Sequence, residues 1–206
     1  MKNLAIFGDS YSTFKDCVPQ GYAHYYPRLD VVRKEQTWWS LFSEKTGYKL
    51  ILNDSWSGST VGYTGYNNCD CSKTSSFICR YRKVKASGFF EKNRVDTVIV
   101  LGGTNDSWAD APLGEMKFSD WEEGDLFNVL PAVCYFLHEL KADLPYAEIL
   151  CVINTDMKPE VQNCMEKAAK RYGLKSLRLR DIEKENGHPT AKGMTEICEQ
   201  VIASLK

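Results

Sequence analysis

The hydrophobic residues of the chain fall into short, uniformly apolar runs separated by longer and more polar stretches. Apolar runs of strand length predict β-strands at residues 4–7, 49–53, 97–101, 148–154 and 176–179. The intervening stretches place apolar residues at helical spacing and predict helices at residues 37–46, 76–85, 126–142, 159–172 and 190–205. Strands without polar alternation are typical of parallel strands covered on both faces. The pattern therefore predicts the α/β class, a three-layer α/β/α sandwich with a five-stranded parallel sheet.

The boundaries of the predicted helices carry their own signals. Thr37 and Thr190 are expected to cap helix N-termini, and Gly47 and Gly173 are expected to end helices. No internal repeat and no Pro/Gly/Ser-rich linker divides the 206 residues. We therefore expect residues 1–206 to form a single domain.

Charge and hydropathy exclude several classes of function. The 26 cationic and 27 anionic side chains give a formal net charge of -1, which argues against a large nucleic-acid footprint. The basic residues between Arg80 and Lys85 are interpreted as a solvated helix face. No apolar run is long enough to span a bilayer. The start of the chain lacks the long apolar core of a secretory signal, so a cytoplasmic location is expected.

Eight cysteines are scattered along the chain, and only Cys69, Cys71 and Cys79 form a cluster. The cluster contains no Cys-x-x-Cys pair and no neighbouring histidine, which a zinc site would favour. We therefore expect reduced, partly buried thiols, and neither a metal nor another cofactor.

Candidate chemistry follows the ends of the first three predicted strands. Ser10 lies directly after the first strand, where its hydroxyl and its N–H can face the same space. Gly58 follows the second strand and can bring a backbone N–H close to a ligand. Asn105 follows the third strand and offers a side-chain amide. Two backbone N–H groups and one amide are the donors that an oxyanion hole requires.

His188 is the candidate base for such a site. It precedes Pro189, which favours an extended or turn conformation just before the last predicted helix. A histidine in a loop at this point can reach neighbouring strand ends. His138 lies in an apolar predicted helix and His24 in an aromatic-rich loop, and nothing in the sequence assigns either a proton-transfer role.

These blocks resemble those of the SGNH hydrolases, also called GDSL esterases and lipases. The residues that match the four letters of the family are Ser10, Gly58, Asn105 and His188, and they occur in the family's order. The resemblance implies a flavodoxin-like fold and metal-free hydrolysis of an ester or thioester by a serine nucleophile. Ser10, Gly58 and Asn105 would form the oxyanion hole. Asp9 and Asp106 are expected to brace the turns beside Ser10 and Asn105.

The third member of the catalytic group is where the sequence departs from the family. The family usually has an aspartate three residues before its histidine, and here that position is Glu185. Glu185 can still accept a hydrogen bond from the Nδ1–H of His188, and it is the first candidate. Asp181 and a backbone carbonyl are the alternatives.

The expected partner is a small-molecule ester, and the sequence does not indicate an oligomeric state. Aromatic residues near the strand ends favour a small-acyl or acylated-carbohydrate ester, although Trp38 and Trp39 are expected to be core residues. Two alternatives stay open, a thioesterase or lysophospholipase-type acyl hydrolase and a non-catalytic flavodoxin-like ligand-binding module. The second lacks a phosphate-binding glycine pattern after the first strand.

Overall fold

A parallel sheet of five strands forms the centre of the protein in a computed structural model that describes residues 1–206. Its strand order, β2-β1-β3-β4-β5, is the flavodoxin-like order. The strands are β1 (Asn3–Gly8), β2 (Lys49–Ser55), β3 (Thr97–Leu101), β4 (Glu148–Ile153) and β5 (Lys175–Arg178). The predicted five-stranded parallel sheet is confirmed, and each strand lies within two residues of its predicted bounds.

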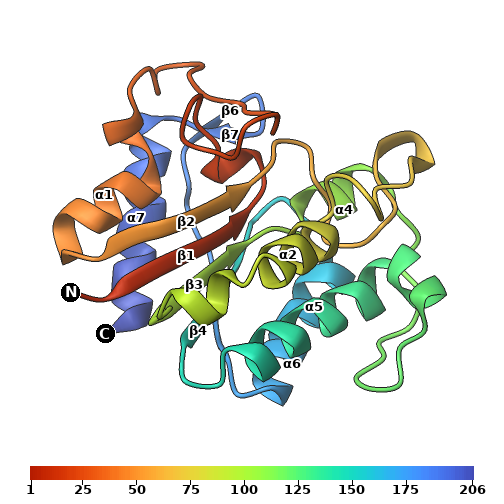
Figure 1. Ribbon diagram of the computed structural model, residues 1–206. Helices are drawn as coiled ribbons and strands as arrows, with labels where there is room; N and C mark the ends of the chain where they lie inside the picture. The colour runs from red at the N-terminus through yellow and green to blue at the C-terminus, as the bar shows by residue number, and fades with distance from the viewer.

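Helices cover both faces of the sheet, as Figure 1 shows. One face packs against α1 (Trp38–Thr46) and α7 (Ala191–Leu205), and the other packs against α2 (Phe77–Ala86), α5 (Val129–Asp143) and α6 (Pro159–Arg171). Two separate hydrophobic cores result, one on each side of the sheet. The predicted α/β/α sandwich is therefore confirmed. No helix of the fold combines the length and the apolar character needed to cross a membrane.

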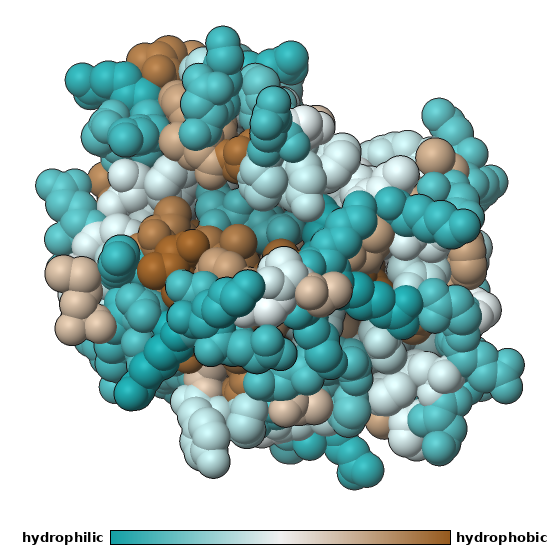
Figure 2. Space-filling model, viewed as in Figure 1, coloured by the Kyte–Doolittle hydropathy of each residue, from teal (hydrophilic) through white to brown (hydrophobic).

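Edge strand β2 is covered less completely than the strands beside it. Residues Leu50, Ile51 and Leu52 are only partly buried, whereas every residue of β3 is buried. Figure 2 shows hydrophobic residues gathered in the region of β2. The buried centre of the sheet consists of β1, β3 and β4, and the first two of these strands lead into the candidate residues Ser10 and Asn105.

The helix signals read from the sequence are present in the structure. The Thr37 side chain accepts a hydrogen bond from Ser40 N at the start of α1, and Thr190 accepts one from Gly193 N at the start of α7. Gly47 follows α1 with a left-handed φ of 74°. The predicted caps are confirmed.

Several short elements have no counterpart in the predicted pattern. They are the helices α3 (Phe89–Lys92) and α4 (Thr104–Trp108), four short 3-10 segments (Ser10–Ser12, Lys34–Gln36, Tyr66–Asn68 and Glu123–Phe127), and an antiparallel hairpin of β6 (Lys184–Glu185) and β7 (His188–Pro189). The two turn residues of the hairpin, Asn186 and Gly187, have φ values of 49° and 75°. Positive φ at both positions is what a type I′ turn requires, and Asn-Gly is a favoured sequence for it.

Candidate active site

Ser10 begins a 3-10 turn directly beyond the buried end of β1. Gly8 precedes it at a point of close packing, where an added Cβ would lie 2.6 Å from Ser55 Oγ. The same turn is held by α1, because the Trp38 and Trp39 indoles donate hydrogen bonds to Ser12 Oγ and Ser12 O at 3.2 and 3.0 Å. Both tryptophans are buried, so the expectation that they are core residues is confirmed.

His188 meets Ser10 although the two residues lie 178 positions apart in the sequence. The distance from His188 Nε2 to Ser10 Oγ is 3.0 Å. Ser10 is almost fully buried, and His188 is half-buried. This is the geometry of a nucleophile beside the base that can take its proton.

The other imidazole nitrogen of His188 faces a backbone carbonyl. His188 Nδ1 lies 3.1 Å from Asn186 O, so in the tautomer that leaves Nε2 free to accept from Ser10, Nδ1–H donates to that carbonyl. Glu185 pairs with His188 across the hairpin, yet its exposed carboxylate forms no hydrogen bond or ion pair with the imidazole. Asp181 forms none either.

The expectation that Glu185 orients His188 is therefore not met by these contacts, and the carbonyl alternative is the one the geometry favours. The reason is the backbone conformation of the turn. Positive φ at Asn186 and Gly187 folds the chain back tightly enough for the Asn186 carbonyl to reach the imidazole of His188, two residues further on. The Asn-Gly dipeptide was the available sequence signal for this turn.

Aromatic rings surround the imidazole of His188. The Tyr25 ring stacks on it with centroids 3.6 Å apart and planes 6° apart, and Trp108 approaches edge-on at 6.0 Å. Burial lowers the pKa of His188, the positive charges of Arg28 and Lys184 lower it further, and the hydrogen bond to the Asn186 carbonyl opposes the shift. A neutral imidazole, the form a general base needs, is thereby favoured at neutral pH.

The three hydrogen-bond donors expected at the oxyanion hole keep donor capacity that no group inside the chain uses. The N–H groups of Ser10 and Gly58 have no intramolecular acceptor. Asn105 donates one Nδ2 hydrogen to Ser59 O at 3.0 Å and keeps the second, while the Tyr66 hydroxyl donates to Asn105 Oδ1 at 2.8 Å. The Asn105 amide therefore lies against Ser59, the residue after Gly58, and its orientation is fixed by hydrogen bonds at both its nitrogen and its oxygen.

The carboxylates of Asp9 and Asp106 are both completely buried next to these donors. Asp9 accepts a hydrogen bond from Tyr11 N, and Asp106 accepts from Val61 N and Gly62 N. Burial raises the pKa of Asp9 to about 7 and that of Asp106 to about 6, and the backbone hydrogen bonds oppose both shifts. These contacts tie the turn after β1 and the loop after β2 in place.

A buried ion pair, which the sequence did not suggest, joins the strand ends. Arg80 in α2 is fully buried and pairs with Asp54 at the end of β2. Its guanidinium also donates to Gly8 O and Ser59 Oγ, both at 3.2 Å. The interpretation of this stretch as a solvated helix face is wrong for Arg80, because the α2 face that carries it packs on the sheet.

Metal-ligating side chains, cysteines and cavities are the other features of the molecule that could bind a ligand. No group of three or more His, Cys, Asp or Glu side chains is arranged to hold a metal ion, and all eight cysteines are free thiols. One surface cavity is lined by residues such as Val95, Asp96 and Ala147, next to the amino ends of β3 and β4. The cavity therefore lies at the amino ends of the strands, whereas Ser10 lies at their carboxyl ends.

Comparisons with known proteins identify the family of the chain. The sequence profile of the family described as GDSL-like lipase/acylhydrolase matches residues 2–205. A comparison with curated proteins finds no match. With a profile match over nearly its whole length, the chain belongs to the GDSL-like lipase/acylhydrolase family, and it is an ester-hydrolysing enzyme.

Solved structures place the chain among bacterial relatives. A protein of Bacteroides uniformis described as a GDSL-like lipase is 39% identical, with a TM-score of 0.92 over 100% of this chain and 95% of that one. A second, from Bacteroides ovatus, is 36% identical, with a TM-score of 0.91 over 100% and 98%. An acetyl xylan esterase of Butyrivibrio proteoclasticus is 15% identical, with a TM-score of 0.63 over 99% of this chain and 63% of that one, and so shares the fold.

Proposed function

We propose that the protein cleaves a carboxylic ester through an acyl-enzyme on Ser10. His188 Nε2 takes the proton of Ser10 as Oγ attacks the ester carbonyl, and then gives that proton to the departing alkoxide. A water molecule, deprotonated by the same nitrogen, then attacks the acyl-serine. The acid is released as His188 returns this proton to Ser10 Oγ. The observation that carries this proposal is the 3.0 Å approach of His188 Nε2 to Ser10 Oγ.

Charge that develops on the carbonyl oxygen is stabilised by three donors in this scheme. They are the N–H groups of Ser10 and Gly58 and the free hydrogen of Asn105 Nδ2. Their lack of intramolecular acceptors supports the assignment, because donors already satisfied within the chain would have to break a hydrogen bond first.

The catalytic group is a Ser10–His188 dyad oriented by the Asn186 carbonyl. A carbonyl oxygen can fix the tautomer of the imidazole as a carboxylate does, but it brings no full negative charge to stabilise the imidazolium. The 3.1 Å contact of His188 Nδ1 with Asn186 O supports this assignment over Glu185 and Asp181. The whole of residues 1–206 then acts as one catalytic domain, because the site draws on segments from residue 8 to residue 189.

We take the substrate to be a small-acyl or acylated-carbohydrate ester. Two large aromatic side chains stay partly exposed at the site, Trp108 beside His188 and Tyr66 on Asn105, with 39% and 41% of their surfaces accessible. Such rings can pack against the apolar face of a sugar. Carbohydrate esterases among the structures of similar fold are consistent with this choice. The cytoplasmic location expected from the sequence stays a prediction.

The test is a panel of p-nitrophenyl esters of increasing acyl length, a thioester and acetylated sugars, each assayed with wild type and with Ser10→Ala. Turnover of acetyl esters that disappears in Ser10→Ala is expected. A preference for long acyl chains or thioesters would replace the proposed substrate with the lysophospholipase or thioesterase alternative. Turnover that survives in Ser10→Ala would overturn the proposed nucleophile.

A further inference from the structure

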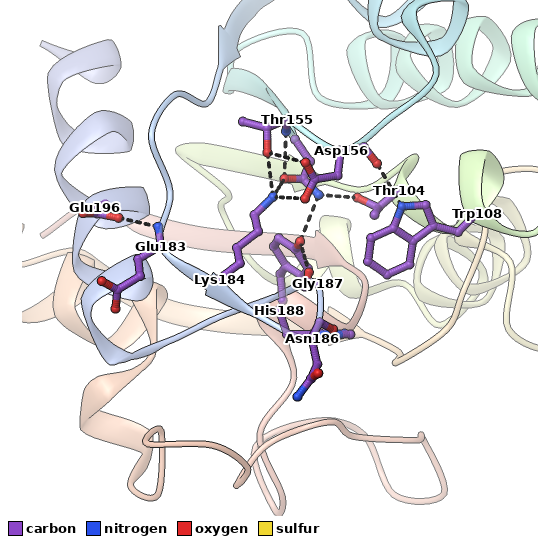
Figure 3. Close-up of polar contacts among 12 residues, drawn as sticks. Thr104, Trp108, Thr155, Asp156, Glu183, Lys184, Asn186, Gly187, His188 and Glu196 are labelled. Carbon is purple, nitrogen blue, oxygen red and sulfur yellow. Dashed lines mark hydrogen bonds and ion pairs between the residues drawn. The ribbon is translucent and has the colours of Figure 1, made fainter.

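Lys184 occupies an unusual position for a lysine in a short surface hairpin. Its ammonium group lies within hydrogen-bond distance of three acceptors at the end of β4: Asn154 Oδ1 at 2.8 Å, Thr155 Oγ1 at 2.6 Å and Asp156 Oδ2 at 2.8 Å. Only 11% of its side chain is exposed. An ammonium has three donors, so all of them are satisfied by one short segment (Figure 3).

The segment that holds Lys184 also contacts the hairpin turn by a second route. Asn154 Nδ2 lies 3.1 Å from both Tyr11 Oη and Thr104 Oγ1. The Tyr11 hydroxyl in turn donates to Gly187 O at 2.5 Å. Figure 3 shows this branched polar network, in which Lys184, Gly187 and Thr104 lie at the ends of the branches. The hairpin is therefore fixed both at its strand β6 and at its turn.

The hairpin depends on such contacts because it is too small to hold itself together. Its ladder pairs only Lys184 with Pro189 and Glu185 with His188. An isolated two-stranded hairpin is at best marginally stable in water, even when longer. The same few residues carry both His188 and the carbonyl that faces its Nδ1.

We propose that Lys184 is a positioning residue for His188, clamping the hairpin to the end of β4 so that the imidazole keeps its place beside Ser10. The inference rests on the proposed function of the Ser10–His188 dyad. In a catalytic triad, a carboxylate holds the histidine in place by a hydrogen bond to the imidazole. Here Lys184, which is largely buried, holds the hairpin that carries the histidine. Lys184 does not touch the reacting atoms, and its effect passes through the hairpin.

Charge gives this role a signature that ordinary structural support would lack. The charged groups that act on His188 are Arg28 and Lys184, and both lower the pKa of His188, while the Asn186 carbonyl raises it. Asp156 neutralises part of the Lys184 charge. Removing Lys184 is therefore expected to raise the pKa of His188, and removing Asp156 to lower it.

The kinetic experiment compares Lys184→Met with Lys192→Met. Lys192, in the first turn of α7, is the matched control, because it also pairs with an acid, Glu183, but is 67% exposed. Lys184→Met should lower kcat roughly 10- to 100-fold with little change in KM, since a misplaced base affects the chemical step. The acid limb of its kcat profile should move to higher pH. Lys192→Met should match wild type in both respects.

Asp156→Asn and Thr155→Val keep the lysine and so guard against a Lys184 variant that does not fold. Asp156→Asn should move the acid limb to lower pH, opposite to Lys184→Met. Thr155→Val should lower kcat by a smaller factor and leave the limb in place. A kcat within twofold of wild type in all three variants would overturn the inference.

A measurement without substrate separates this inference from the proposed function. The His188 imidazole is titrated by NMR in the free protein, with His188→Ala used to assign its signal, and amide exchange is followed at residues 184–188. Lys184→Met is expected to raise the pKa of His188 and to speed exchange across the hairpin. An unchanged titration and unchanged exchange would refute the clamp, whatever esters the wild-type enzyme hydrolyses.

Discussion

The two halves of the site are built in different ways. The half that contains Ser10, Gly58 and Asn105 lies at the ends of three strands of the sheet, and Arg80, which is fully buried, joins two of these ends by hydrogen bonds to backbone and hydroxyl oxygens. The half that contains His188 is a four-residue ladder outside the sheet, held by Lys184 and by Tyr11.

This difference matches what each half has to do. Oxyanion donors act by being fixed before charge develops, which favours backbone groups at the ends of buried strands. A general base has to exchange protons with serine, leaving group and water, and its pKa has to suit the working pH. A half-buried hairpin places the imidazole where charged and aromatic neighbours can tune that pKa.

The largest expected effect comes from removing either reacting group. Ser10→Ala deletes the nucleophile and His188→Ala deletes the base, so each should lower kcat/KM by a factor on the order of 10⁶. The double variant should be no worse than either single one, since the two act as a unit. Steady-state kinetics on p-nitrophenyl acetate measure this. Clearly additive losses would show that the two halves act independently.

Asn105→Ala tests the sheet-bound half alone. Two backbone donors would remain, so kcat should fall by roughly 10²- to 10³-fold with a smaller change in KM. Tyr66→Phe is the companion variant, because it removes only the hydroxyl that donates to Asn105 Oδ1. It should cost much less than Asn105→Ala. An equal loss in both variants would mean that the amide acts only when Tyr66 orients it.

The pH profile tests the hairpin half. In the proposed mechanism the neutral imidazole is the active form, and burial together with Arg28 and Lys184 lowers the pKa of His188. Activity should therefore persist through pH ~6.5, the ordinary value for histidine, and fall about tenfold per pH unit only below the lowered pKa. The measurement is kcat/KM against pH. A limb above pH ~6.5 would indicate a carboxylate partner that raises the pKa instead.

The smallest effect is expected from the carboxylates that the sequence offered as partners of His188. Glu185→Gln and Asp181→Asn should each leave kcat/KM within about threefold of wild type, because neither side chain contacts the imidazole. Both variants are measured on the same ester as Ser10→Ala, with thermal unfolding as the control for folding. A Glu185→Gln variant that is folded and as inactive as Ser10→Ala would restore Glu185 to the catalytic group.

The fold could be predicted from the sequence where burial is uniform, and less well where polar residues are buried. Strand β3 is apolar along its whole length, and its predicted and observed bounds coincide. Strand β2 continues past its prediction through Asp54 and Ser55. Those residues can be buried in a strand because Arg80, from a different element, neutralises Asp54. The hydrophobic pattern around β2 does not indicate that a distant arginine pairs with Asp54.

The site shows the same limit. The strand-end glycines and polar residues led to Ser10, Gly58, Asn105 and His188, and the structure brings Ser10 and His188 into contact. The group that faces His188 Nδ1 could not be chosen from side-chain types, because it belongs to the backbone. Lys184 and Tyr11 contact segments that are distant in sequence. The spacing of hydrophobic residues along the chain does not predict such contacts.

The Asn186 carbonyl has a consequence for how this enzyme can vary among its relatives. A carboxylate partner can be lost by one substitution, whereas a main-chain oxygen is present whatever residue occupies position 186. The sensitive position is Gly187, where φ is 75° and an added Cβ would lie 2.9 Å from the Trp108 ring. Sequence drift at positions 185 and 186 that preserves the turn would leave the base oriented, and a motif search that demands an acid three residues before the histidine would pass over such enzymes.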